Sequence, residues 1–420
     1  MTGINPRLGI PVDETVRGLD ELAVALNHCV LLLASWTCDI PEIEAKILVG
    51  DHLHRDARTV SALRYRIEEL AHDPSPQVDP ANTAHCPPDL AVVSWLDATL
   101  PRLYGLYFAV KSRLAERMRR HAGATHPVAD EPTVRLLREA ADDLEAQVRD
   151  AGEVMDQLRM IFPDLPAPAV TAAEWDRARA AGASGFRHVR PTEARRDSRF
   201  RVLPDAPPVP LRSSESIPAH LHGVLMATEI PTIETCGRAV ADFPDMPWEF
   251  VLDMGRQSWD ESRHARMLYE RMTQLGGRPG MEPVDRQVWE LTDGLPLELR
   301  LAVHQRTGEW LGVDGTILNA GRFRDYGDPL SAQMFDYIAA DEITHVRIGN
   351  TWVHRLAGSD ERVLEIQEAA LRHRSGFSTT VNGSPQLPFN HEVCVRAGFK
   401  EWEIEALEQR RTGLPTASEF

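Results

Sequence analysis

The sequence predicts an all-helical protein in which two helical bundles follow one another in a chain of 420 residues. Long segments carry apolar residues three or four positions apart, which is the spacing of one buried helix face. Pro and Gly residues separate these segments, as expected where helices end. In the second half of the chain, one pattern of acidic residues and histidines occurs twice, which indicates a repeated arrangement of helices.

The first bundle is predicted over residues 1–162, with amphipathic helices at about 16–36, 41–70, 90–121 and 132–161. The last of these repeats apolar residues in an alternating four-three pattern, which is typical of a bundle seam. The polar candidates for a metal site are His28, Asp51, His52, His54, Glu69 and His72. They lack matching partners on the third and fourth helices, and we attribute the lone Glu-x-x-His among them to chance. We therefore predict a metal-free bundle with a structural or substrate-gating role.

Residues 163–215 are predicted to form a linker, because Pro is frequent there and helical spacing is sparse. The Arg residues of this stretch are Arg187, Arg190, Arg195, Arg196, Arg199 and Arg201. They could bind an anionic substrate or cofactor, but in an acidic protein we expect them to pair with its own carboxylates. Residues 359–420 are predicted to form helical segments that pack on the second bundle, with a lid as a further role.

The second bundle is predicted over residues 216–358, and it contains the motif Asp-Glu-x-x-His twice. The first copy runs from Asp260 to His264, and the second runs from Asp341 to His345. On a helix, a Glu and a His three residues apart are separated by about 60° around the axis. Both side chains can therefore reach the same ion, and each pair can act as a bidentate metal ligand.

The spacing of two further Glu residues strengthens this signal. Glu229 precedes Glu261 by 32 residues, and Glu309 precedes Glu342 by 33 residues. Half a helix, a short loop and half of the next helix take about 30 residues when the helices hold about 25. Four neighbouring helices would therefore direct these four carboxylates, together with the histidines of both motifs, to one site.

Several stretches of the second bundle resemble a largely uncharacterised group of bacterial ferritin-like proteins. These stretches are Ala227–Glu234, Asp260–His264 with Gly276–Gly277, Glu309–Asp314, and Asp341–His345 with Gly349 and Trp352. The resemblance covers roughly residues 216–358 and implies a four-helix bundle with a di-metal carboxylate site. It also implies that Asp260 and Asp341 accept the second N–H of a ligand His and fix its tautomer.

The chain departs from this group at two positions. Leu311 occupies a place where the group usually has Arg, within Glu-x-Arg-Gly-Leu-Asp. Pro231 follows Glu229 by two residues, and a Pro inside a helix kinks or bulges it, so the direction of Glu229 is hard to predict. Glu234 and Asp314 each follow a lone Glu by five residues, about 140° away around a regular helix. We expect these two carboxylates to join a polar network rather than the metal site.

The composition excludes several classes of partner. The net charge of −17 disfavours nucleic acid, because phosphate binding requires a basic surface. We find no 18-residue apolar run and no basic-then-apolar N-terminus, so we expect neither a membrane span nor a secretory signal, and we expect a cytoplasmic protein. The five cysteines are scattered and never form Cys-x-x-Cys, which argues against a disulfide framework or a zinc ribbon.

Four carboxylates and two imidazoles nearly neutralise two divalent ions, and these donors suit iron or manganese. We therefore expect two iron ions as the cofactor, with an Mn/Fe pair as the alternative. The first functional hypothesis is a non-haem di-iron oxidase or oxygenase that uses O2 and an external electron donor to oxidise a small organic substrate. The alternative is a ferroxidase, an iron-storage protein or a peroxide scavenger. A homodimer is one assembly that we consider.

Three features favour the oxidase hypothesis. An additional helical domain and a long tail do not suit a compact ferritin cage, and the Cys-x-x-Cys module of a rubrerythrin-like peroxidase is missing. A radical site like that of ribonucleotide reductase would place Tyr one turn beyond a ligand His, where this chain has Leu268. Gly308 and Gly312 are expected to leave room for substrate beside Glu309, although close helix packing would also use Gly. We expect the remaining histidines of this region, His222 and His304, to be pocket or core residues.

Overall fold

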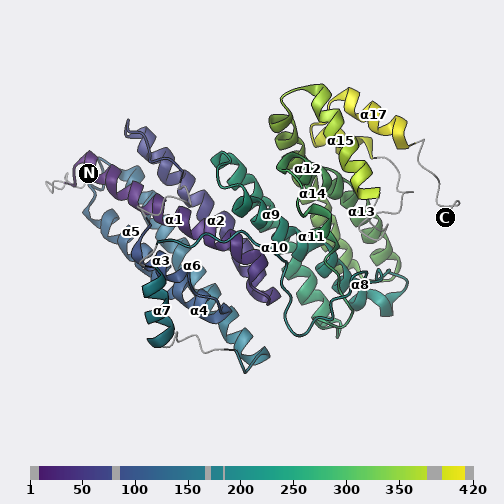
Figure 1. The fold of residues 1–420 in the computed structure, drawn as a ribbon, viewed down its shortest axis with the longest axis horizontal. Coiled ribbons are helices and arrows are strands. Elements are labelled where there is room, and N and C mark those ends of the chain that lie inside the picture. The colour runs from purple at the N-terminus through teal and green to yellow at the C-terminus, as the bar shows by residue number, and fades with distance from the viewer. Residues whose placement is uncertain (1–8, 78–85, 166–171, 183–184, 376–389, 412–420) are drawn as a thin grey trace. The chain divides into compact units, whose positions relative to one another are not determined.

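A computed structural model describes residues 9–77, 86–165, 172–182, 185–375 and 390–411 of the chain (Figure 1). Within these ranges the regular structure is helical, apart from one isolated parallel bridge between Val202 and Val284. The prediction of an all-helical protein is therefore confirmed.

The chain divides into two compact units, and two helices contribute residues to both. The first unit holds residues 1–195 and 236–259, and the second holds residues 196–235 and 260–420. The helices with residues in both units are α9 (Ile230–Asp242) and α10 (Trp248–Gln274). Residues 196–215, which precede the predicted second bundle, belong to the second unit by their packing.

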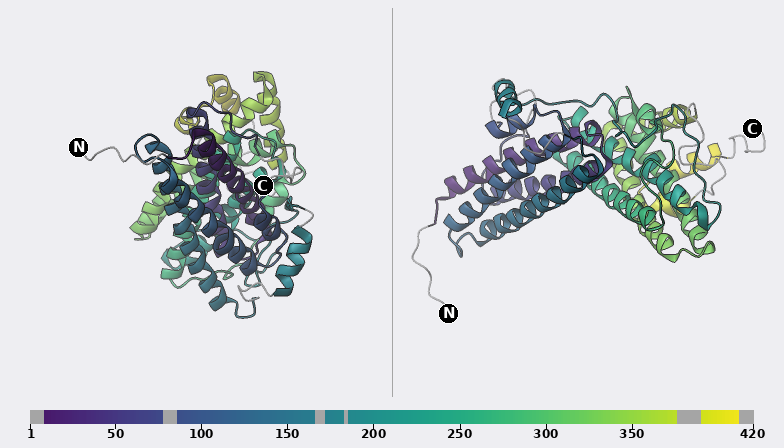
Figure 2. Two further views of the ribbon diagram at one scale, coloured as in Figure 1. Left: turned by 90° about the vertical axis from the view of Figure 1, so that its left-hand side faces the viewer. Right: turned by 90° about the horizontal axis from the view of Figure 1, so that it is seen from below.

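The first unit is a bundle of long helices with one shared core. Its long helices are α1 (Val12–Asp39), α2 (Ile43–Glu69), α5 (Ser112–Ala124) and α6 (Glu131–Ile161). Helix α2 packs against both α1 and α6, and α5 also packs against α6. Figure 2 shows these purple-to-blue helices side by side. Helix α6 starts where the side chain of Asp130 accepts the N–H of Thr133 at 3.3 Å, which caps the first turn.

Helix α1 is long and apolar enough to cross a membrane by length and composition. In the structure, 89% of its 18-residue apolar window is buried, and Leu26, Cys29 and Leu33 have no exposed surface. A central bundle helix has neighbours on several sides, so its sequence is apolar around most of its circumference. The expectation that no such apolar run exists is corrected, because α1 contains one within the core of the first unit.

The predicted third helix of this unit consists of shorter pieces. The pieces are α3 (Pro88–Val93), α4 (Thr99–Leu103), the π-helical segment η2 (Tyr104–Lys111) and α5. Pro101 explains the break before α4, because it lacks an N–H and its ring would clash with the carbonyl four residues earlier. Pro101 lies in the first turn of α4, where Pro is tolerated, and the chain leaves helical geometry between α3 and α4.

The described part of the predicted linker includes an α-helix. Helix α7 (Ala172–Gly182) forms there because its sequence is rich in Ala, which has the highest helix propensity. A short 3-10 turn, η3 (Ser214–Ser216), follows near the end of the stretch. The described residues between these two elements are non-helical, in agreement with their high Pro content.

Four long helical stretches form the second unit's bundle. The first consists of α8 (Ile217–Val224), the π-helical η4 (Leu225–Glu229) and the start of α9 up to Thr235, and the second is α10 from Asp260 onward. The third consists of α12 (Leu297–Leu301), the π-helical η5 (Ala302–Gly308) and α13 (Glu309–Asp325), and the fourth is α14 (Pro329–Ala357). A short helix, α11 (Gln287–Thr292), precedes the third stretch.

The ends of α14 follow directly from its sequence. The side chain of Asp328 accepts the N–H of Ser331 at 3.1 Å, and Pro329 occupies the first turn, where its missing N–H costs nothing. At the other end, Gly358 adopts a left-handed conformation with φ of 73°, which an L side chain would disfavour. Both signals predict the observed boundaries.

The C-terminal helices pack on the second unit. They are α15 (Asp360–Ser375), α16 (His391–Arg396) and α17 (Glu401–Arg411). Apolar residues of α16 and α17 share a buried cluster with Trp310 and Val313 of α13. Glu403 of α17 forms a buried ion pair with Arg306 of η5, and His354 of α14 lies 3.2 Å from the same carboxylate. Helices α16 and α17 thus take part in the core around η5 and α13.

Candidate metal centre

The six side chains predicted from the repeated motif lie together in the second unit. Glu229 ends η4, Glu309 begins α13, and α10 and α14 each supply one Glu and one His. The side chains from α10 and α14 are Glu261, His264, Glu342 and His345. All six residues are buried, and both histidines have no exposed surface.

Their ligand atoms form two overlapping groups, within each of which all atoms lie within 4.8 Å of one another. One group is Glu229, Glu261, His264 and Glu342, and the other is Glu261, Glu309, Glu342 and His345. Glu261 and Glu342 belong to both groups. Because a carboxylate has two oxygens, each of these two residues can bind one cation with each oxygen.

The Nδ1 atoms of the two histidines face the carboxylates. His264 Nδ1 lies 3.2 Å from Glu229 Oε2 and 3.4 Å from Glu261 Oε2. His345 Nδ1 lies 3.0 Å from Glu261 Oε1 and 3.1 Å from Glu342 Oε2. The centroids of the two rings are 6.1 Å apart. Each histidine thus belongs to one group and adjoins the carboxylates that both groups share.

The Nε2 atoms donate outward to the two Asp residues of the motif, in a crossed arrangement. His264 on α10 donates to Asp341 Oδ2 on α14 at 3.2 Å, and His345 on α14 donates to Asp260 Oδ2 on α10 at 3.3 Å. A proton held on Nε2 in this way leaves the Nδ1 lone pair directed at the carboxylate cluster, where a cation could bind it. Each Asp therefore orients the histidine of the other motif.

Arg263 connects the same two Asp residues and was not singled out from the sequence. Its Nη2 donates to Asp341 Oδ2 at 2.8 Å and also to Asp260. Burial disfavours the charged form of Asp341, but the hydrogen bonds from His264 and Arg263 outweigh burial and lower its pKa. Asp341 thus stays an anionic acceptor. The one available signal was a cation three residues after Asp260 on the same helix.

Both lone Glu residues lie at the C-terminal end of a π-helical turn. Glu229 is the last residue of η4, and Glu309 directly follows Gly308, the last residue of η5. A π turn widens one turn of a helix, so it shifts the direction of the residues that follow, and such turns occur frequently at functional sites. Pro231 accounts for η4, because a helix containing Pro must bulge or kink. The π turn turns Glu229 toward His264, whereas no Pro predicts η5.

The four clustered carboxylates disfavour one another's ionisation. Burial, together with the charge of Glu342, raises the pKa of Glu309 well above its usual value. Burial and the charge of Glu261 likewise raise the pKa of Glu342, and burial raises the pKa of Glu261 to about 7. Burial also acts on Glu229, but the nearby imidazole of His264 and its positive charge outweigh burial and lower the pKa of this carboxyl.

The histidines respond in the opposite direction. Burial disfavours the imidazolium of His264, but Asp341, Glu229 and Glu261 outweigh burial and hold its pKa well above the usual value. The charges of Glu342 and Glu261 do the same for His345. In the absence of a metal, protons thus balance part of the negative charge, and a bound cation would replace them.

The donor set fits a metal ion. Glu229 Oε2, Glu261 Oε1 and His264 Nδ1 are buried and make no hydrogen bond of acceptable geometry with any residue that the structure describes. Buried polar atoms rarely stay unpaired, and a cation between them would satisfy all three. Carboxylate oxygens and imidazole nitrogens suit ions such as iron or manganese. The cluster could therefore hold metal ions.

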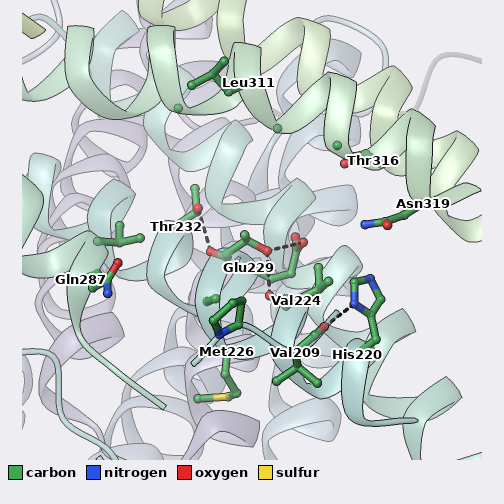
Figure 3. A pocket seen from close by; sticks show the side chains of 18 of the residues that line it. Val209, His220, Val224, Met226, Glu229, Thr232, Gln287, Leu311, Thr316 and Asn319 are labelled. Atoms are coloured by element: carbon green, nitrogen blue, oxygen red, sulfur yellow. Dashed lines mark hydrogen bonds between the residues drawn. The ribbon is translucent and has the colours of Figure 1, made fainter. Parts of the chain in front are cut away.

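A cavity of about 380 Å³ adjoins the cluster, and all four carboxylates line it. Its remaining wall combines apolar residues, among them Val224, Met226, Leu311, Phe335 and Ile338, with polar residues such as Thr232, Gln287 and Asn319. Figure 3 shows Glu229 in the middle of this pocket, between Leu311 of α13 and Val209 of the segment before η3. The volume lies in the range of small-molecule sites.

Two glycines beside Glu309 shape this cavity differently. A Cβ atom at Gly312 would meet Glu309 Oε2 at 4.0 Å and nothing closer among the described residues. At Gly308, a Cβ atom would lie 3.2 Å from Arg374 Nη1 and 3.5 Å from His304 Nδ1. The expected gap next to Glu309 is thus present at Gly312, whereas Gly308 makes space for two side chains.

The other histidines of this region also line the cavity. His222 accepts the N–H of Gly280 at 3.0 Å, and burial lowers its pKa to about 4. Burial lowers the pKa of His304 to about 3, and its Nε2 lies 3.6 Å from Glu309 Oε1. Asp314 lies on α13 outside both ligand groups. His222 and His304 are thus neutral pocket residues.

The Arg-rich stretch pairs with the protein's own carboxylates. Arg196 makes two hydrogen bonds to Glu234, and both side chains are buried. Arg199 Nη2 lies 2.7 Å from Asp197 Oδ2. Glu234 therefore belongs to a polar network, as expected from its position on the helix, and not to either ligand group.

The isolated Glu-x-x-His of the first unit is not assembled into one site. Glu69 Oε2 accepts a hydrogen bond from Arg66 at 2.8 Å. His72 Nδ1 lies 2.7 Å from the carbonyl oxygen of Leu70. The two side chains thus interact with different neighbours near the end of α2.

The first unit also contains a buried polar network that the sequence did not suggest. Lys111 and Asp56 form a fully buried ion pair at 2.7 Å, and Gln147 donates to Asp56 at 3.0 Å. His52 Nδ1 lies 2.8 Å from the hydroxyl of Tyr107 in the same core. Lys111 is the last residue of η2, so this π-helical segment also positions a buried charged side chain.

Comparison with known proteins gives a family but no activity. A protein family described as "Protein of unknown function (DUF455)" matches residues 166–405, a range that contains the whole cluster. An uncharacterized protein of Haemophilus influenzae is 27% identical over 158 residues, which is 37% of this chain and 53% of that relative. The chain thus matches about half the length of this curated relative. No solved structure matches the chain.

Proposed function

We propose that this chain, which belongs to the DUF455 family, is an O2-dependent oxidoreductase of the ferritin-like di-metal type. It would bind two iron ions, with an Mn/Fe pair as the alternative, and oxidise a small organic substrate with electrons from an external donor. One observation carries the proposal: the four buried carboxylates of the ligand groups line a cavity of ligand size, and part of its wall is apolar. A substrate in that cavity would lie next to the metal ions.

The six inner residues would divide the coordination of the two ions among themselves. His264 would bind one ion with Glu229, and His345 would bind the other ion with Glu309. Glu261 and Glu342 would connect the two ions, since both belong to both groups. Bound iron supplies the one-electron chemistry that reactions with O2 require.

The outer residues would keep the histidines ready for metal binding. Asp260 and Asp341 hold the Nε2 protons, so the Nδ1 lone pairs stay directed inward. Arg263 donates to both Asp residues, and together with His264 it lowers the pKa of Asp341, which therefore stays charged. The apolar wall of the cavity would exclude water from the reacting groups and strengthen the electrostatic interactions there.

The alternative is a ferroxidase, an iron-storage protein or a peroxide scavenger that uses the same cluster. Such a protein needs a path for small ions or peroxide, but it does not need an apolar space for an organic molecule. The walls formed by Val224, Met226 and Phe335 therefore favour the oxidase.

The test uses the full-length protein, reconstituted anaerobically with ferrous iron and mixed with O2. We expect two iron ions per chain and a transient visible absorption that decays faster with some member of a panel of small organic acids, alcohols and amines. Gly312→Leu should fill the open space in the cavity and slow this substrate-dependent decay several-fold, with little loss of iron. Gly321→Leu is the matched control, because Gly321 lies on the same helix, also has open space, and does not line the cavity.

The storage hypothesis predicts a different result. Protein that oxidises ferrous iron in bulk, builds a mineral core and responds to no compound of the panel would replace the oxidase proposal. An equal loss of substrate response in the Gly312→Leu and Gly321→Leu variants would show that the reaction with substrate does not depend on the open space in the cavity.

A further inference from the structure

Two arginines line the cavity beside the carboxylate cluster, the exposed Arg322 on α13 and Arg374. Arg374 lies in the last turn of α15 and lines the same cavity as the four Glu residues. Its Nη1 donates to the backbone carbonyl of Val303, in η5, at 2.9 Å. Burial lowers the pKa of Arg374 to about 10, and the negative charge of Glu309 acts against this effect. The side chain therefore stays positively charged at neutral pH.

The local backbone places this cation directly beside the ligand helix. A Cβ atom at Gly308 would lie 3.2 Å from Arg374 Nη1, so the absence of a side chain there allows the close approach. Gly308 directly precedes Glu309, which lies in one of the two ligand groups. Arg374 Nη1 thus lies close to Gly308, the residue directly before the ligand Glu309.

An anion bound in the cavity would stabilise the positive charge of Arg374. A guanidinium has five N–H donors, and the structure records one hydrogen bond for it among the described residues, to Val303. The carboxylate that influences its pKa is Glu309. If Glu309 binds a metal ion, its charge is shared with that ion, and a second anion is needed to balance a half-buried Arg374.

The rest of the cavity wall combines polar residues, such as Gln287 and Asn319, with an apolar part that a small inorganic anion would leave unused. Val224, Met226, Leu311, Phe335 and Ile338 offer an apolar surface on the other walls. Such walls favour a hydrocarbon chain or ring, because apolar contact removes its surface from water. Arg binds a carboxylate with two parallel hydrogen bonds, which fix its orientation.

We propose that the cavity binds an organic acid, with its carboxylate on Arg374 and its hydrocarbon part along the apolar wall next to the metal cluster. The inference rests on the proposed function, for which it names the class of substrate. An acid held at one end by Arg374 would present its carbon chain to the carboxylate cluster in one orientation, which is what a selective oxidation needs.

The test compares octanoate with 1-octanol, which has the same chain but no charge, on the metal-reconstituted full-length protein. We expect calorimetric titration to show octanoate bound at least tenfold more tightly than 1-octanol. Arg374→Gln should weaken octanoate at least tenfold and change 1-octanol less than twofold, because hydrogen bonds to charged groups are the stronger ones. Arg374→Lys, which keeps the charge, should recover part of the octanoate affinity.

Arg372→Gln is the matched control, since Arg372 lies on the same helix two residues earlier, is exposed, and pairs with Glu368 at 3.4 Å. It should leave both affinities unchanged. Equal binding of the two probes to the wild type, or unchanged octanoate binding by Arg374→Gln and Arg374→Lys, would overturn the inference. Iron content and the reaction with O2 are measured on the same samples. A protein that binds iron and reacts with O2 but fails the octanoate test refutes this inference alone.

Discussion

At the scale of single residues, substitution of the two inward-facing histidines tests the metal centre. His264 and His345 supply the imidazole nitrogens of the two ligand groups. An ion that loses one ligand from a buried set binds more weakly, because the protein cannot readily replace the donor. We expect His264→Ala and His345→Ala each to lose at least one of the two metal ions per chain, as measured by elemental analysis after anaerobic reconstitution.

The control for this prediction comes from the first unit. The double variant Glu69→Ala/His72→Ala removes a second Glu-x-x-His, whose side chains contact Arg66 and the Leu70 carbonyl instead of each other. Its metal content should equal that of the wild type. A wild-type protein that takes up one ion or none would refute the two-ion assignment itself.

The crossed Asp–His pairs give a second prediction at the same scale. Asp341→Asn keeps the size of the side chain but removes the negative charge that holds the Nε2 proton of His264. Loss of such an outer partner typically weakens metal binding 10–100-fold, so we expect a decrease of about that size in competition with a chelator. Asp336→Asn, at an exposed position of α14 paired with Arg324, should leave the affinity unchanged. Equal effects of the two substitutions would show that Asp341 does not act through His264.

At the scale of secondary-structure elements, the contact between α17 and η5 fixes the turn before Glu309. Arg306 of η5 and Glu403 of α17 are both nearly completely buried and pair with each other. Glu403→Gln would leave the Arg306 charge buried without a compensating anion. Breaking a buried pair in this way costs about 3–5 kcal/mol, so we expect a drop of that size in the free energy of unfolding in urea.

Metal content provides the second measurement for this variant. Because η5 ends directly before Glu309, a disturbed turn should also reduce metal binding. Glu405→Gln on the exposed side of α17 is the control and should change neither quantity. A Glu403→Gln protein as stable as the control would mean that Arg306 finds another partner.

Much of the helical architecture could be predicted, because its signals are local. Asp328, Pro329 and Gly358 mark the ends of α14 by capping and backbone conformation, which depend on adjacent residues alone. The 32- and 33-residue intervals between carboxylates predicted which side chains would meet, because helix length and loop length determine where neighbouring helices align.

The features that escaped prediction depend on contacts between distant residues or on small changes in helix geometry. Segment η5 contains no Pro, and a widened turn has no compositional signal of its own. Arg374 lies 65 residues after Glu309, and only the folded chain places it beside Gly308. The crossed contacts of Asp260 and Asp341 likewise require the positions of α10 and α14 relative to each other.

At the scale of the whole molecule, the two units differ in what stabilises their cores. The first unit buries the Lys111–Asp56 ion pair, in which both charges come from the protein. The second buries four carboxylates and two histidines, whose excess negative charge is balanced by protons or by a metal. Each unit has its own compact set of contacts. Metal binding should therefore stabilise the second unit selectively.

Hydrogen exchange can measure this difference along the chain. A ligand that binds only the folded state stabilises it by about 4 kcal/mol at a concentration 1,000 times its Kd. We expect reconstitution with iron to slow amide exchange in α14, which carries Glu342 and His345, by a large factor, while exchange in α6 of the first unit changes little. In the His264→Ala/His345→Ala double variant, added iron should no longer slow exchange in α14. Equal slowing in α14 and α6 of the wild type would show that the two units open together, and equal slowing in the double variant would show that iron binds elsewhere.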